Sequence, residues 1–228
     1  MRISEEKSRI REEVWRKFGC RGKIPPFRGQ DKAALLLAAL PEYRRARRVF
    51  SPPDGAQLEA RLQILKDGKI LIVATPGLRD GFYGINPEEV PERLWKEGVS
   101  IRGIRRIGRK LRTSFEDIGE IDLMITGAVA VSLRGERIGK GTGFFDQEFL
   151  ILRSIGCVRE ETPIAALVDD QQVFEELPFG EHDVPVDIII TPTRLIRIPE
   201  RRKKPSELPS FLVDFSKRPY RELFGQKI

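Results

Sequence analysis

A glycine-rich loop between a short apolar segment and an amphipathic helix constrains this chain more than any other feature. Residues 128–133, AVAVSL, have the β-branched content of a buried strand, and residues 121–126, IDLMIT, have the same character. The chain continues RGERIGKGTG, after which Phe145, Phe149 and Leu152 recur at spacings of four and three. Because these spacings place side chains on one helical face, we expect a helix directly after the glycines.

The glycine loop is a candidate anion site because it precedes that helix. The first amides of a helix lack internal partners and carry about half a positive charge, so they attract anions. Gly139, Gly141 and Gly143 have no Cβ that would keep a phosphate away from the backbone. The spacing matches neither GxxxxGK[ST] nor GxGxxG, which excludes a P-loop and a dinucleotide-binding fingerprint. We predict nucleotide binding here, with a plain turn as the alternative.

Polar side chains around the glycines fit a nucleotide and its metal ion. Arg137 and Lys140 supply cations for phosphates, and Thr142 adds a hydroxyl group. Asp146, in the first helical turn, is suited to hold Mg²⁺, although the helix dipole alone also favours an acid there.

A βαβ unit earlier in the chain places a second candidate residue. A strand near Val49, a helix over residues 56–66 and a strand over residues 70–74 form this unit. In open parallel sheets ligands gather beyond the carboxyl ends of the strands, so Asp54 is well placed to bind a polar substrate. A role as a turn or cap residue is the alternative.

Two cationic segments have a structural and a functional interpretation. Residues 4–18 form an amphipathic helix on which Lys7 and Arg11 share a face, either as solvated charges or as ligands of an anion. Residues 101–112, IRGIRRIGRKLR, form either a solvated face or a surface for RNA.

Two blocks of the sequence resemble a known family. RIGKGTGFFDQEFL is similar to the RLGxGxGYYDxxL signature of the 5-formyltetrahydrofolate cyclo-ligase family, and LPFGEHDVPVDIIITPT resembles its segment with an acidic pair before a late strand. The resemblance extends over residues 7–193. Residues 22–37, GKIPPFRGQDKAALLL, are more similar to a divergent branch, the methenyltetrahydrofolate synthase domain-containing proteins.

This resemblance implies a fold and a reaction. The fold is a three-layer, Rossmann-like α/β domain with a mainly parallel central sheet flanked by helices. The reaction is the ATP- and Mg²⁺-dependent cyclisation of 5-formyltetrahydrofolate to 5,10-methenyltetrahydrofolate, with release of ADP and phosphate. The alternative is a non-catalytic, nucleotide- or RNA-binding member of the divergent branch. A reduced folate or related pterin is the expected partner, and a monomer or homodimer the expected state.

The resemblance also implies residue roles. Asp54 stands where the family has a glutamate that holds the folate, and Asp183 joins Asp146 in holding Mg²⁺. Arg137 and Lys140 are the expected catalytic contacts to the phosphates. The expected nucleotide-binding residues are Lys7, Arg11, Arg137, Gly139, Lys140, Gly141, Thr142, Gly143, Phe144 and Phe145.

The sequence departs from the family pattern at the same site. Phe144 and Phe145 replace a tyrosine pair, so two hydroxyl groups are lost. Thr142 stands where the family has glycine or lysine, and Asp54 is one methylene shorter than glutamate. The lost tyrosine hydroxyl groups, together with two arginine clusters at residues 44–48 and 102–112, are the reason for the non-catalytic alternative.

Length and composition limit the number of domains, the kind of partner and the cellular location that we expect. A chain of 228 residues with 40% apolar content suits one domain, to which residues 197–228 add a basic, proline-containing extension, packed on the domain or partly disordered. A net charge of +7 favours anionic partners such as ATP, a polyglutamylated folate or RNA. No apolar run reaches eighteen residues and the N-terminus is charged, so we expect a cytoplasmic protein without a membrane span. Two isolated cysteines support neither a zinc site nor a disulfide framework.

Overall fold

An eight-stranded mixed sheet forms the centre of the molecule. The structure is a computed structural model and describes residues 3–210, 213–214 and 216–225. The strands of the sheet are β1 (Arg48–Ser51), β2 (Ile70–Ala74), β3 (Phe82–Ile85), β4 (Arg109–Leu111), β5 (Leu123–Thr126), β8 (Ile164–Leu167), β10 (Ile188–Ile190) and β11 (Leu195–Arg197).

The sheet order is β11-β10-β8-β5-β1-β2-β3-β4, and its five inner strands from β10 to β2 are parallel. The edge strand β11 at one end of the sheet, and the last two strands β3 and β4 at the other, are antiparallel to their neighbours. The mixed α/β fold with a large, mostly parallel sheet confirms the predicted fold class, with antiparallel edges that the sequence patterns did not reveal.

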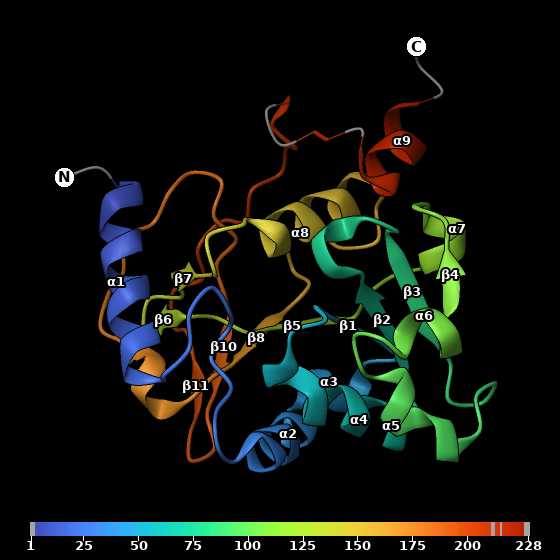
Figure 1. The fold of residues 1–228 in the computed structure, drawn as a ribbon, viewed down its shortest axis with the longest axis horizontal. Helices are drawn as coiled ribbons and strands as arrows, with labels where there is room; N and C mark the ends of the chain where they lie inside the picture. The colour runs from blue at the N-terminus through green and yellow to red at the C-terminus, as the bar shows by residue number, and fades with distance from the viewer. Residues whose placement is uncertain (1–2, 211–212, 215, 226–228) are drawn as a thin grey trace.

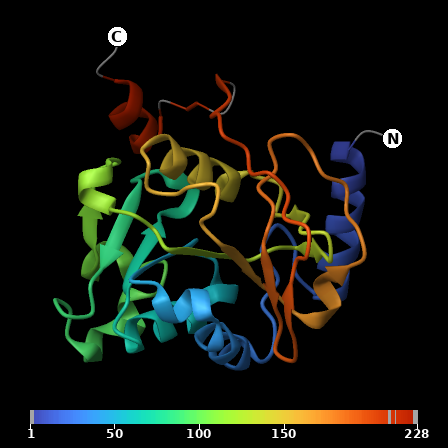
Figure 2. The same ribbon diagram turned by 180° about the vertical axis from the view of Figure 1, so that it is seen from behind.

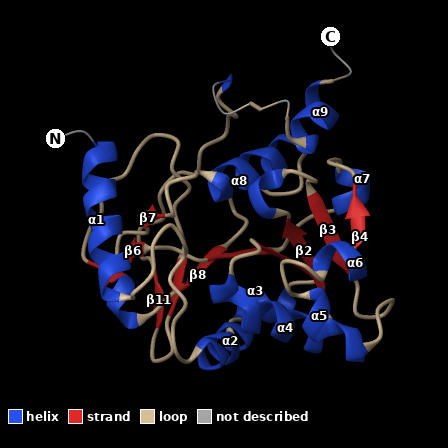
Figure 3. Cartoon of the chain, viewed as in Figure 1, coloured by secondary structure: helices blue, strands red, loops and turns tan. Residues whose placement is uncertain are grey.

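Helices cover both faces of this sheet (Figures 1 and 3), with α2, α3 and α4 on one side and α8 on the other. Successive side chains of a strand point to opposite faces of the sheet, so the protein has two hydrophobic cores. Val49 of β1 packs in the first core and Phe50 in the second. The helices are α1 (Ile3–Lys17), α2 (Gln30–Ala39), α3 (Pro41–Arg45), α4 (Leu58–Lys66), α5 (Trp95–Gly98), α6 (Ile104–Ile107), α7 (Phe115–Ile118), α8 (Phe144–Ser154) and α9 (Arg218–Phe224).

The segment AVAVSL forms a strand outside the main sheet. A second, three-stranded sheet has the order β7-β6-β9, from β6 (Ala130–Ser132), β7 (Arg137–Ile138) and β9 (Val173–Phe174). β6 and β7 form an antiparallel hairpin. β7 ends at Ile138 and α8 begins at Phe144, so the glycine loop connects this small sheet to the start of α8.

Two parts of the C-terminal segment contact the body of the molecule. The Lys204 ammonium group is buried, 3.0 Å from Asp187 Oδ2, and donates to two carbonyl oxygens. The buried Tyr220 hydroxyl group of α9 lies 3.0 Å from Gln147 Oε1 of α8, and Figure 2 shows α9, in red, next to α8, in gold. Residues 211–212, 215 and 226–228 lie outside the described residues. No helix in the described ranges is long and apolar enough to cross a membrane.

An ion pair ties α3 to the edge strand β11 and predicts a pH effect. Glu42 accepts two hydrogen bonds from Arg197, of 2.6 and 2.9 Å, and this contact lowers the pKa of Glu42 to about 2. The unfolded pKa of glutamate is about 4.3, so the stabilisation is complete above that pH and is lost as the pH falls toward the folded pKa. Because solvent screens a surface pair, we expect Glu42→Gln to lower the free energy of unfolding by about 1 kcal/mol near neutral pH.

Urea unfolding of wild type and Glu42→Gln across acidic and neutral pH measures this effect. The difference between the two proteins should shrink as the pH falls below about 4. Glu12→Gln, which removes the exposed partner of Arg21 at 3.0 Å, is the control and should change little at any pH. A difference between wild type and Glu42→Gln that does not depend on pH would contradict the ion-pair explanation.

Candidate functional site

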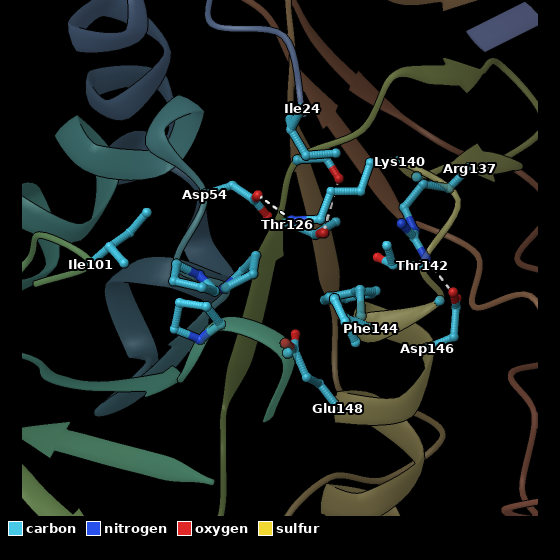
Figure 4. Close-up of a pocket in the computed structure, with 18 residues that line it drawn as sticks. Ile24, Asp54, Ile101, Thr126, Arg137, Lys140, Thr142, Phe144, Asp146 and Glu148 are labelled. Carbon is cyan, nitrogen blue, oxygen red and sulfur yellow. Dashed lines mark hydrogen bonds and ion pairs between the residues drawn. The ribbon is translucent and has the colours of Figure 1, made fainter. Parts of the chain in front are cut away.

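A pocket opens at the carboxyl ends of β1 and β5. Asp54 follows β1, Thr126 ends β5, and the glycine loop with the first turn of α8 closes the opposite side. Figure 4 shows Asp54, Lys140, Arg137 and Glu148 around this pocket. The position agrees with the rule that open parallel sheets bind ligands beyond the carboxyl ends of their strands.

The glycine loop takes backbone conformations that favour glycine. Gly141 and Gly143 have φ values of 96° and 63°, and Gly143 is the N-cap residue of α8. A glycine N-cap has no side chain to accept hydrogen bonds from the first-turn amides. The N-terminus of this eleven-residue helix therefore faces the pocket with uncapped donors, as the anion-site prediction requires.

Two ion pairs join the glycine-loop region to its surroundings. Lys140 Nζ lies 2.8 Å from Asp54 Oδ1, and Arg137 Nη2 lies 2.6 Å from Asp146 Oδ1. The Arg137 side chain is 4% exposed and stacks on the Phe145 ring, 4.6 Å from its centroid. Both cations predicted to bind phosphate are thus held in place by carboxylates of the same pocket.

α1 supports the glycine loop from outside the pocket. Arg11 Nε donates to the Gly139 carbonyl oxygen at 2.8 Å, and burial lowers the pKa of Arg11. The buried Lys7 forms an ion pair with Asp183. The face shared by Lys7 and Arg11 is therefore not a solvated surface.

The loop that carries Asp54 is held by a buried arginine that sequence reasoning missed. Arg61 of α4 is 1% exposed and donates to the carbonyl oxygens of Pro52, Asp54 and Val99 at 2.8 to 2.9 Å. Burial lowers its pKa to about 10. Because three carbonyl groups share one guanidinium group, the backbone at Asp54 is fixed without using the Asp54 carboxylate.

Glu148 is a second residue that sequence reasoning missed. It lines the pocket from α8, is 2% exposed, and its Oε2 atom has no hydrogen-bond partner among the described residues. Burial, followed by the nearby charge of Asp54, raises the pKa of Glu148 well above its usual value. The signal for it was an acid on the apolar stripe of the helix, three residues after Phe145.

The sequence of residues 3–192 matches the profile of the 5-formyltetrahydrofolate cyclo-ligase family. The chain belongs to this family. The match covers the first block and all but the last residue of the second, and it includes every residue of the predicted site.

Similar proteins fall into two groups. The chain is 32% identical over 219 residues to a methenyltetrahydrofolate synthase domain-containing protein of Bos taurus, covering 90% of this chain and 57% of that protein. It is 34% identical over 79 residues to a 5-formyltetrahydrofolate cyclo-ligase of Mycolicibacterium smegmatis, covering 35% of this chain and 38% of that one. The chain therefore spans a little over half the length of its domain-containing relative.

The fold also matches a solved structure. A 5,10-methenyltetrahydrofolate synthetase of Aquifex aeolicus superposes with a TM-score of 0.56 at 22% identity, covering 87% of this chain and 96% of that one. At this identity the likeness establishes the shared fold of the cyclo-ligase family.

The predicted site residues divide into pocket-lining residues and residues of a surrounding layer. Four predicted site residues do not line the pocket: Lys7, Arg11, Gly141 and Asp183. Of these, Arg11 contacts the pocket-lining Gly139, and Lys7 pairs with Asp183. The predicted residues that line it are Asp54, Arg137, Gly139, Lys140, Thr142, Gly143, Phe144, Phe145 and Asp146.

The two acids predicted to hold Mg²⁺ lie on segments in contact. The Val184 amide, next to Asp183, donates to Asp146 Oδ1 at 3.0 Å. Among the described residues no group of three or more acids, histidines or cysteines forms a metal cluster. Two carboxylates nevertheless fit Mg²⁺, which commonly takes one or two of them together with substrate phosphates and water.

Proposed function

We propose that this protein catalyses the ATP-dependent cyclisation of 5-formyltetrahydrofolate to 5,10-methenyltetrahydrofolate. One observation carries the proposal beyond family membership: Lys140, expected at the phosphates, contacts Asp54, expected at the folate. A phosphate on the glycine loop and a pterin at the strand ends would then meet within one pocket.

The chemistry requires positioning and charge neutralisation. The formyl oxygen attacks the γ-phosphorus as ADP leaves. N10 then attacks the activated carbon, phosphate leaves, and the N10 proton passes to the phosphate or to solvent. Arg137 and Lys140 would bind the phosphoryl oxygens, and the uncapped amides of α8 would bind the triphosphate. No protein residue needs to form a covalent bond in this scheme.

Asp146 and Asp183 would hold the Mg²⁺ ion that accompanies the nucleotide. The ion supplies further neutralisation of phosphate charge. Before ligand binds, Asp146 is paired with Arg137 and Asp183 with Lys7. In the proposed complex both acids would hold the metal in place of these cations, and Arg137, which lines the pocket, would bind the phosphates.

The arginine-rich segment 101–112 supports a small-molecule function over RNA binding. Arg105 pairs with Asp80 at 2.5 Å and Arg112 with Asp117 at 3.4 Å. Because these arginines already have acidic partners, less of their charge is available to a polyanion. RNA binding by the divergent branch is therefore the second candidate.

A turnover assay tests the proposed reaction. Purified protein with ATP, Mg²⁺ and 5-formyltetrahydrofolate should form a product with the near-ultraviolet absorbance of methenyltetrahydrofolate, together with one ADP for each product molecule. Omission of ATP is the control and should abolish the signal. Absence of product across a wide range of enzyme concentration would refute the reaction, and RNA binding with a steep salt dependence would favour the second candidate.

A further inference from the structure

The pocket contains a buried acid without a partner. Glu148 is 2% exposed, and its Oε2 atom accepts no hydrogen bond from any described residue. In Figure 4 its carboxyl group points from α8 into the pocket, opposite Asp54 and Lys140. The other two acids of the pocket have cationic partners, because Asp54 pairs with Lys140 and Asp146 pairs with Arg137.

Another buried glutamate shows how such a group is normally accommodated. Glu136 is 3% exposed, and its carboxylate receives hydrogen bonds from the Ser132 hydroxyl group, the Leu177 amide and Arg202. Leaving a buried polar atom unpaired destabilises the folded protein, and more so if the group is charged. The unpaired Oε2 atom of Glu148 lies beside an open pocket. A ligand in that pocket can therefore donate the hydrogen bond that this atom does not receive from the protein.

The surroundings of Glu148 select the kind of ligand. Pro52, Pro53, Pro76 and Phe145 line the same pocket, and such apolar walls suit a flat ring. An acceptor between apolar walls calls for N–H donors at the ring edge. The family signature YYDxxL leaves the position of Glu148 unspecified, so family membership assigns it no role.

We propose that Glu148 binds the ring edge of the substrate by accepting hydrogen bonds from an exocyclic amino group and the adjacent ring N–H of a 2-amino-4-oxo pterin. This inference rests on the proposed function, since it names the residue that recognises the pterin ring. Asp54, committed to Lys140, then interacts with groups nearer the phosphates.

A cycle of ligand and protein changes tests the inference. Isothermal titration under anaerobic conditions compares 6-methyltetrahydropterin with its 2-deamino analogue on wild type, Glu148→Gln and Glu148→Leu. We expect wild type to prefer the amino compound by about 10- to 100-fold, as for a hydrogen bond to a charged or buried acid. Glu148→Leu should bind both compounds equally, and Glu148→Gln, which keeps one acceptor oxygen, should retain part of the preference.

A stability control separates recognition from a structural role. Because Glu148→Leu removes an unpaired polar atom, the unliganded variant should melt at or above the wild-type temperature. A purely structural acid would instead lose stability on replacement. MgATP should raise the melting temperature of wild type and Glu148→Leu equally.

The possible outcomes distinguish this inference from the proposed reaction. A preference for the amino pterin that Glu148→Leu abolishes supports the inference, even if no methenyl product forms. An undiminished preference in Glu148→Leu overturns it while the reaction can stand. Glu148→Leu could instead bind MgATP more weakly than wild type does, while its binding of pterin and of MgITP is unchanged. That result would assign Glu148 to the adenine amino group and would also overturn the inference. If wild type binds no tetrahydropterin, both the inference and the folate reaction fail.

Discussion

Replacing Lys140 with alanine is expected to lower kcat for methenyltetrahydrofolate formation by about 100- to 1000-fold, the usual loss when a fixed donor to transition-state charge is removed. The Lys140 side chain is 25% exposed and its ammonium group is 2.8 Å from Asp54 Oδ1. Partial burial strengthens its attraction for charge that develops on the γ-phosphate. The variant also leaves the Asp54 carboxylate unpaired where the substrate would bind, which should raise KM.

Two further variants make this expectation specific. Lys140→Arg keeps the charge but changes its geometry, so it should recover only part of kcat. Lys66→Ala removes an equal charge from the exposed last turn of α4 and should leave turnover unchanged. The measurement is steady-state kinetics, together with the melting temperature of each variant. A Lys140→Ala protein with wild-type kcat would remove this residue from the phosphate site.

Local patterns allowed much of the fold to be predicted from the sequence. The strand over residues 70–74 coincides with β2, and the helix after the glycines coincides with the start of α8. Both depend on periodicity and glycine positions, which are set within a few residues of the chain. The placement of residues 128–133 in a second sheet, and the antiparallel edges of the first, depend on contacts between distant segments and left no local signal.

The same distinction applies to the site. Glycine content and charge predicted an anion-binding role for the glycine loop, whereas the contact between Lys140 and Asp54 joins residues 86 positions apart in sequence. Arg61 resembles any helical arginine until three carbonyl groups converge on it. Glu148 was visible as an acid on an apolar helical face, but its missing partner is a property of the folded pocket.

The ion pairs of the pocket predict that nucleotide and metal bind together. Arg137, Lys140 and Lys7 each pair with a carboxylate. A triphosphate that takes up these cations leaves carboxylates unpaired in a partly buried pocket, which is costly unless another cation replaces them. Mg²⁺ can restore the balance at Asp146 and Asp183, so each ligand should strengthen the binding of the other.

Asp146→Asn should therefore separate the stabilisation by Mg²⁺ from the stabilisation by ATP alone, which occur together when MgATP binds to wild type. At about one hundred times its dissociation constant, MgATP should stabilise wild type by about 2.7 kcal/mol, a rise in melting temperature of about 5–10 °C. The variant should lose the part of this rise that depends on Mg²⁺. The smaller shift with ATP and a chelator should persist or grow, because Arg137 no longer has a carboxylate partner and is free to bind phosphate.

Asp80→Asn is the matched control, since it also removes an aspartate paired with an arginine but lies outside the pocket lining. It should respond to ATP and Mg²⁺ as wild type does. An undiminished Mg²⁺-dependent shift in Asp146→Asn would refute the metal assignment. Loss of the metal-free ATP shift would instead show that Asp146 serves only to position Arg137, because without its partner the arginine would no longer be held toward the phosphates. Loss of the Mg²⁺-dependent shift while the metal-free ATP shift is retained follows from a single exchange of ion partners, which a purely structural Asp146–Arg137 pair would not produce.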